Sequence, residues 1–149
     1  MTEEDANLAA DVKKASENSN FLELCECISK LDSKIAGALV IRYGKLLATA
    51  NGAGASLPSD EYLSKLIRQA EVVVGIQLAN TPFFGHFNYL LVSFDRLDSL
   101  LFYLKIQKVI LGVGLLPPYD ISVLLGKIQE YLKTGSLSSV EAAGTEYNL

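Results

Sequence analysis

The side chains that most often perform catalysis or bind metals are scarce in this sequence, which has one histidine, His86, and two cysteines, Cys25 and Cys27. The cysteines lie two positions apart within a helical pattern, so their side chains point in different directions and cannot readily form a disulfide with each other. A zinc site would need further ligands near them, and the histidine is distant in sequence. We therefore expect two reduced thiols, with Cys25 in the core, and neither a metal site nor a cofactor.

Acidic and glycine-rich segments give no clearer catalytic signal. Asp95 and Asp98 flank a short connection, where turn chemistry explains them better than an acid–base pair does. Segment 51–56, Asn-Gly-Ala-Gly-Ala-Ser, shares only its glycines with a phosphate-binding loop, because no Gly-Lys-Ser/Thr opens the following helix. Without a nucleophile and base that could act together, the sequence indicates a protein that is not an enzyme.

Charge argues against two further classes of function. The formal net charge is −4 and the Lys and Arg residues form no cluster, so the basic surface of a nucleic-acid-binding protein is missing. The longest apolar window, residues 100–116, contains Lys105 and Lys108, and each charge would cost about 2.5–3.5 kcal/mol at the centre of a bilayer. We expect neither a nucleic-acid partner nor an integral membrane segment. The acidic start Met1–Asp5 is unlike a signal peptide, which favours a cytoplasmic location.

The elements that would position any site begin with three apolar runs, residues 88–94, 100–104 and 109–115. The gaps between them are too short for a parallel crossover, so the runs are expected to pair as an antiparallel meander. Each run is nearly continuous in apolar residues rather than alternating. This predicts a sheet that is covered on both faces.

Two more strands precede the meander. Residues 36–42 and 46–50 flank Tyr43-Gly44-Lys45, and the glycine supplies the positive φ of a tight hairpin turn. Runs 36–42 and 108–115 alternate least and are predicted nearest the centre. Consecutive strands are expected to pair antiparallel except across the helix between residues 50 and 88.

Apolar residues at three- and four-residue spacing predict three helices. The first includes Phe21 to Ile35, the second begins at Ser59 or Asp60 and continues through Val74, and the third follows Pro117-Pro118-Tyr119-Asp120 and stops at Gly135. A strand-like reading of Val72–Val74 stays open, because β-branched residues disfavour helices. The predicted fold class is α+β, a five-stranded antiparallel sheet with helices on both faces in the order α-β-β-α-β-β-β-α.

The ends of the chain are polar and have little to pack. Thr2 could cap a short helix with Asp5, but residues 1–19 are predicted to form a flexible extension. Residues 20–135 form the domain, and residues 136–149 are predicted to be a disordered tail.

The second helix carries apolar residues on more than one side, and a chain this small has few elements left to cover them. The missing cover is predicted to be another subunit. Aromatic residues in the connection that follows, 80–87, either extend this predicted partner surface or pack against the edge of the sheet. The candidate interface residues are Tyr62, Val72, Val73, Ile76, Phe84, Phe87 and Tyr89.

The hairpin Lys34-Ile-Ala-Gly-Ala-Leu-Val-Ile-Arg-Tyr-Gly-Lys-Leu-Leu-Ala-Thr-Ala50, set between one helix and an acidic-starting second helix, resembles the Roadblock/LC7 family. The resemblance covers roughly residues 21–135. It departs from the family in its Tyr-Gly turn, where an acidic residue before the glycine is commoner, in the linker 80–87 and in both tails.

The resemblance implies an interaction module without catalytic residues. Family members pair through the second helix and the third strand, and act as platforms for small Ras-like GTPases or as scaffold subunits. We therefore expect a homodimer, or a dimer with a paralogue, and a Ras-like GTPase partner. An effect on GTP hydrolysis would come from ordering the GTPase's own switch segments. Arg42, Arg68 and Arg96 are interpreted as solvated surface rather than as an arginine finger.

Two alternatives keep the sheet but change the function. A longin-like trafficking adaptor would be a monomer that docks peptides or helices on one face. A PAS-like sensor would hold a small molecule against the sheet, although such domains place several short helices where this sequence predicts one long helix.

Overall fold

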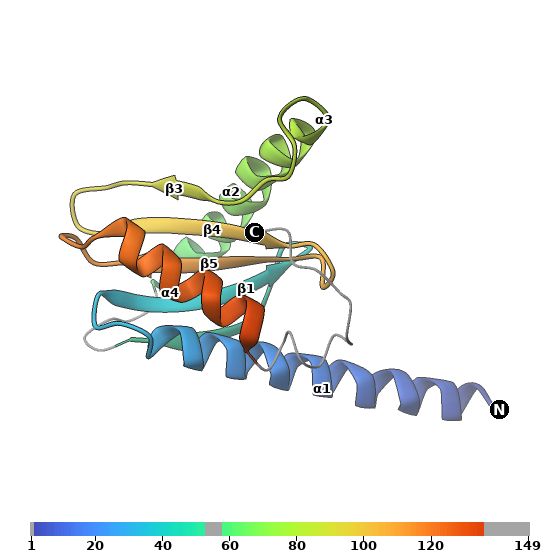
Figure 1. Cartoon of the computed structure of the whole chain (residues 1–149). Coiled ribbons are helices and arrows are strands. Elements are labelled where there is room, and N and C mark those ends of the chain that lie inside the picture. The colour runs from blue at the N-terminus through green and yellow to red at the C-terminus, as the bar shows by residue number, and fades with distance from the viewer. Residues whose placement is uncertain (1, 53–57, 136–149) are drawn as a thin grey trace.

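The computed structural model describes residues 2–52 and 58–135 as a five-stranded sheet with helices on both faces (Figure 1). The elements are α1 (Glu3–Ser29), β1 (Ile35–Arg42), β2 (Lys45–Asn51), α2 (Asp60–Ala79), the one-turn α3 (Thr81–Phe84), β3 (Leu90–Val92), β4 (Asp98–Leu104), β5 (Val109–Leu115) and α4 (Ile121–Thr134). This is the predicted fold class and order, with α3 added between α2 and β3. The predicted tail 136–149 and most of loop 51–56 lie outside the described residues.

All strand pairings in the sheet are antiparallel, and the spatial order is β2-β1-β5-β4-β3. The hairpin β1–β2 and the meander β3–β4–β5 are as predicted. Strand β5 is central and β1 lies beside it, as expected for the least alternating runs. The strands β2 and β3, which flank α2 in the sequence, are the two edges of the sheet and do not pair with each other.

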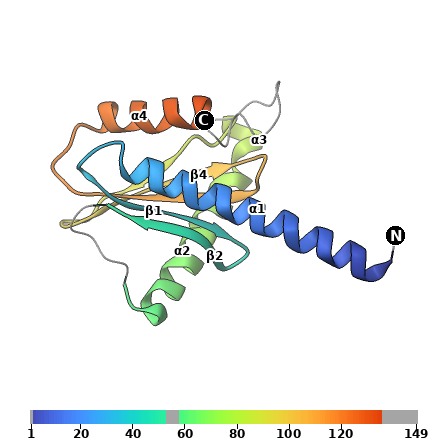
Figure 2. The ribbon, with the colours of Figure 1, turned by 90° about the horizontal axis from the view of Figure 1, so that it is seen from below.

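Alternate side chains of the central strands enter two separate cores. Leu100 and Phe102 of β4 point toward α1 and α4, whereas Leu101 points toward α2. Figure 2 shows α1 and α4 on one side of the sheet and α2 on the other. The continuous apolar composition of these strands follows from this cover on both faces.

Helix α1 is longer than predicted, because it begins at Glu3 instead of near residue 20. The Thr2 hydroxyl accepts the Asp5 backbone N–H at 3.1 Å, while the Asp5 carboxylate accepts from the Thr2 backbone at 3.2 Å. This capping box satisfies donors that would otherwise be lost at the helix start, and the alanines that follow favour helix. Residues 3–19 are thus the first part of a continuous helix rather than a separate segment.

Arg42 fixes α1 to the sheet and is not the solvated residue that we expected. Its Nη1 lies 2.6 Å from the Glu17 carboxylate, and its Nη2 donates to the Gln107 carbonyl at 2.5 Å. The guanidinium also lies over the ring of Phe21, 5.7 Å from its centroid. The side chain therefore joins α1, β1 and the β4–β5 connection.

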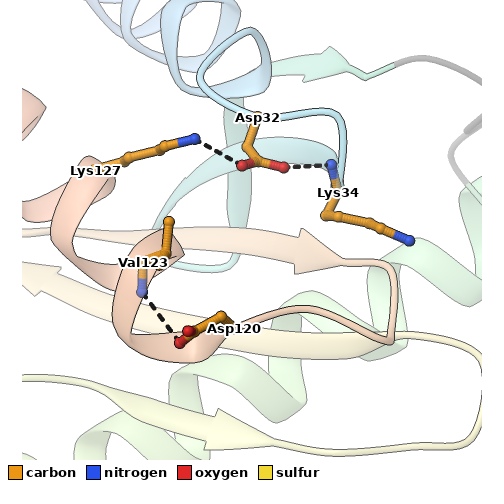
Figure 3. A network of polar contacts seen from close by, with 5 residues as sticks. All are labelled: Asp32, Lys34, Asp120, Val123 and Lys127. Atoms are coloured by element: carbon orange, nitrogen blue, oxygen red, sulfur yellow. Dashed lines mark hydrogen bonds and ion pairs between the residues drawn. The ribbon is translucent and has the colours of Figure 1, made fainter.

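Helix α4 starts at Ile121, later than the prolines that were predicted to open it. Asp120 is the N-cap, and its carboxylate accepts from the backbone of Ser122 at 2.9 Å and Val123 at 3.4 Å (Figure 3). The Lys127 ammonium donates to Asp32 at 2.8 Å, and the other Asp32 oxygen accepts from the Lys34 backbone (Figure 3). These bonds, the Lys127 contact first, lower the pKa of Asp32 and tie α4 to the α1–β1 connection.

Asp98 organises the connection between β3 and β4. Its carboxylate accepts from the Ser93 hydroxyl at 2.9 Å, from the Phe94 backbone at 3.1 Å and from the Tyr119 hydroxyl. Strand β3 is shorter than the predicted 88–94, and the backbone N–H of Phe94, beyond its end, bonds to this carboxylate. Turn chemistry was predicted for Asp98, but its burial was not.

The same network shifts two pKa values. The hydrogen bond from Tyr119, followed by those from Ser93 and Phe94, lowers the pKa of Asp98, whereas burial and the adjacent carboxylate raise the pKa of Tyr119 to about 12. Because the Asp98 pKa is lower in the folded chain, protonation favours unfolding. The stabilisation that the ionised Asp98 carboxylate provides is complete above its unfolded pKa of about 3.9. It is lost as the pH falls through the pKa of Asp98 in the folded chain.

We therefore expect Asp98→Asn to lower the stability at pH 7 and to make the acid-induced loss of stability shallower. Urea unfolding midpoints at pH 7, 5 and 3 would measure both effects. Asp95→Asn in the same connection, where the side chain is exposed, is the control. An acid dependence equal to that of the unmodified protein would contradict the assigned role of Asp98.

Candidate interaction surface

Helix α2 has one face on the sheet and one apolar face in solvent. Leu63, Ile67 and Val74 are buried against the sheet. The helix continues through Val72–Val74 to Ala79, so the strand-like alternative for this segment is wrong. Val74 lies on the same side of the helix as Leu63 and Ile67 and packs with them into the core. This packing outweighs the low helix propensity of the β-branched run.

The opposite side of α2 is apolar and exposed. Tyr62, Leu66, Val72 and Ile76 recur near helical spacing and point away from the sheet. The one-turn α3 adds Phe83 and Phe84, whose exposed fractions are 81% and 84%. These six residues, which we name the α2–α3 face, are the largest exposed apolar side chains on these two helices.

The sheet beneath α2 is thinly covered. Among the described residues, eighteen are buried in the core under α1 and α4, but only six in the core under α2. Leu39, Leu46 and Tyr103 pack against that smaller core but are only partly buried. Two of them belong to the internal strands β1 and β4, where fuller burial would be expected. One helix cannot cover this face of a five-stranded sheet.

Five of the seven predicted interface residues are exposed: Tyr62, Val72, Ile76, Phe84 and Tyr89. Val73 and Phe87 are partly buried and pack on the core under α2. Tyr89 is exposed but does not join the α2–α3 face, because its ring lies 6.5 Å from that of Phe102 in the core on the other side of the sheet.

Two residues of this face were missed by the sequence analysis. Leu66 was not among the predicted interface residues, although it lies one turn from Tyr62, and Phe83 was not chosen although it is next to Phe84. The spacing of four from Tyr62 was the available signal for Leu66. Nothing local distinguishes the three phenylalanines of residues 83–87 from one another.

The position of α2 is set partly by a bond to the β1–β2 turn. The Glu71 carboxylate accepts the backbone N–H of Gly44. Tyr43 and Gly44 adopt positive φ values of 49° and 75°, as the predicted tight turn requires. This hydrogen bond joins α2 to the β1–β2 hairpin that precedes it in the sequence.

The groups considered for catalysis or metal binding are not assembled into a site. Within residues 2–52 and 58–135, no three His, Cys, Asp or Glu side chains come together to hold a metal ion. His86 is exposed next to α3. Among the described helices, none is both long and apolar enough to span a membrane.

The two cysteines differ in environment. Cys25 is buried, and desolvation followed by the charge of Glu26 raises the pKa of its thiol to about 12, whereas Cys27 is half-buried. We expect a disulfide reagent at pH 8 to modify one thiol in the native protein and two in denaturant. Mass spectrometry should locate the native adduct on Cys27, and Cys27→Ser should remove it. A native adduct on Cys25 would show that α1 opens readily.

This arrangement, with two helices on one face of a β2-β1-β5-β4-β3 sheet and one on the other, is the Roadblock/LC7 fold. The Roadblock/LC7 domain from Streptomyces avermitilis superposes with a TM-score of 0.61 at 11% identity, covering 80% of this chain and 97% of that one. MglB of Myxococcus xanthus superposes with a TM-score of 0.60 at 13% identity, covering 87% of this chain and 96% of that one. No protein-family model and no curated protein matches the sequence.

Proposed function

We propose that this protein is a non-enzymatic module that pairs through the α2–α3 face, with a second copy or a paralogue, and that the pair is a platform for a small Ras-like GTPase. The exposed apolar side of α2 over a thinly covered sheet carries the proposal. Burying an aliphatic or aromatic side chain contributes about 1.5–3 kcal/mol, so Tyr62, Val72 and Ile76 alone could offset a substantial part of the cost of association.

The edge strand β3 supports the same surface. It has three residues and forms one edge of the sheet, so no strand within residues 2–52 and 58–135 pairs with its outer side. Pairing of two β3 strands would extend the sheet across the dimer while α2 packs on its counterpart. Such edges invite strand addition unless they are covered.

The GTPase partner is proposed from the Roadblock/LC7 fold together with the resemblance in sequence. As in the expectation from the sequence, the proposed effect on a GTPase is to favour one arrangement of its own switch segments. A cytoplasmic location is part of the proposal, because Ras-like GTPases and reduced thiols are found there.

The test is titration calorimetry with a panel of small Ras-like GTPases from the same source, each loaded with GDP or with a GTP analogue. We expect at least one to bind two copies of this chain with a preference of about fivefold or more for one nucleotide state. Should no member of the panel bind in either state, the GTPase part of the proposal is wrong.

A hydrolysis assay separates the two mechanisms. If the protein orders the switch segments, Arg68→Ala and Arg96→Ala, at two exposed arginines, should leave the GTP hydrolysis rate within about twofold of the unmodified value. A loss of a thousandfold or more in either variant would instead identify an arginine finger. A monomer at micromolar concentration would favour the longin-like adaptor.

A further inference from the structure

The outer side of α1 carries a second exposed apolar stripe, which the proposed dimer leaves free. Leu8, Val12, Ala15 and Leu22 follow one another at spacings of four, three and seven residues, and all are exposed. This is the a/d spacing of helices that pair along their length, with Ser19 as the one polar residue at such a position between Leu8 and Leu22. Phe21, Leu24, Cys25 and Ile28 define the buried side of the same helix, so the stripe faces away from the sheet.

The stripe is long enough for a partner helix. From Leu8 to Leu22 it extends over about 21 Å at 1.5 Å per residue, and the acids Asp5 and Glu26 at its ends lengthen this surface to about 32 Å. Figures 1 and 2 show that the N-terminal part of α1 projects beyond the sheet. Where α1 passes the β4–β5 connection, Leu8 and Val12 line a hollow together with Ile106 and Gln107. Residues 2–16 are exposed throughout.

Acidic side chains lie beside this stripe or at its two ends, on the same side of the helix. They are Glu4, Asp5, Asp11, Glu23 and Glu26, and all five are exposed. Helical geometry places Lys13 and Lys14 on other sides, and only Lys30 shares this side, at its C-terminal end. Glu17 lies on the opposite side of the helix, where it is paired with Arg42.

This charge decides what can cover the stripe. A second α1 would bring acids against acids, and anionic membranes and nucleic acids would be repelled. The segment 136–149 of this chain contains two glutamates and neither lysine nor arginine, so it does not complement the surface either. A helix with basic residues beside an apolar stripe matches both the spacing and the charge.

We propose that the outer face of α1, from Asp5 to Glu26, docks an amphipathic helix of another protein whose apolar stripe is flanked by Lys and Arg. The apolar contact consists of four side chains, so the complex is of moderate affinity and its association is favoured by low salt. This surface is separate from the α2–α3 face, and a GTPase platform could be tethered through it to a larger assembly.

The probe is a synthetic 21-residue helix with Leu at heptad positions a and d and Lys at e and g. Its comparison peptides carry Glu at e and g, or the same composition in scrambled order. Fluorescence anisotropy with the full chain should show saturable binding of the Lys peptide only. Raising the salt from low to physiological concentration should weaken it severalfold.

The chain offers a closely matched pair of variants. Val12 and Val72 are 62% and 60% exposed on different helices. Leu8→Ser with Val12→Ser should weaken peptide binding by about tenfold or more, whereas Val72→Ser should not change it. Asp11→Lys with Glu23→Lys should reverse the preference toward the Glu peptide. Circular dichroism would verify that each variant stays folded.

Three results would overturn the proposal: equal binding of the scrambled peptide, unchanged affinity in the Leu8 and Val12 variant, or no binding of the Lys peptide at millimolar concentration. Self-association that depends on Val12 instead would assign the surface to a second copy. Substitution of Val72 tests the proposed dimer, and substitution of Val12 tests the proposed helix site. A negative result for one of these proposals therefore does not decide the other.

Discussion

Replacing Val72 and Ile76 of α2 with lysine is expected to reduce the mass in solution from twice that of the chain to the 16.2 kDa of a single chain. Both side chains point to solvent in the isolated chain, so the fold should tolerate the change. In a dimer through α2, each lysine would bury an unpaired charge at a cost of several kcal/mol. Light scattering after gel filtration at micromolar concentration would measure the mass.

The control for this experiment is Val123→Lys on α4, which replaces another exposed valine on a helix of the opposite face. That variant should keep the dimer mass. If both variants or neither became monomeric, the assignment of the interface to α2 would be wrong. Thermal unfolding of all three proteins would verify that the change is in association and not in folding.

Phe102→Ala is expected to have the largest effect on stability, lowering the free energy of unfolding by about 3–5 kcal/mol. Phe102 is completely buried in the core between the sheet and the helices α1 and α4, and it contacts the ring of Tyr89. The cavity left by the ring removes dispersion contacts on every side. Since a domain of this size is stable by about 5–15 kcal/mol, this loss is a large fraction of the total, and the urea midpoint of unfolding should fall markedly.

Phe84→Ala is the matched control, because this phenylalanine is 84% exposed at the end of α3. Its free energy of unfolding, from urea titration of the dilute protein, should stay within about 0.5 kcal/mol of the unmodified value. Its self-association should weaken instead. A large loss of stability in Phe84→Ala would mean that α3 belongs to the core of the monomer.

Local patterns predicted the order of the elements because each depends on neighbours in sequence. The glycine of Tyr43-Gly44, the short gaps between the last three strands and the helical spacing from Leu63 to Val74 each restrict the backbone directly. The same spacing left apolar residues on the second side of α2. That predicted an exposed surface, whose main residues the structure places in solvent.

The errors concern contacts between residues that are far apart in sequence. Residues 3–19 look like a loose polar segment, yet they continue α1, and Arg42 pairs with Glu17 twenty-five positions earlier. The Tyr119 hydroxyl donates to Asp98, which lies twenty-one positions earlier. Neither pair can be recognised from the neighbouring residues in the sequence. A polar residue gives the same sequence pattern whether its side chain contacts solvent or a distant partner.

The amino-acid sequence by itself determined the α+β class, the hairpin, the meander and the excess of apolar surface on α2, since periodicity and turn chemistry act over a few residues. Only the tertiary structure decided which apolar residues remain exposed: it turned Tyr89 toward Phe102, left Phe83 in solvent, and projected α1 with its acidic and apolar outer face beyond the sheet. The physical reason is that burial depends on which elements lie opposite a side chain, and that is set by packing of the whole chain.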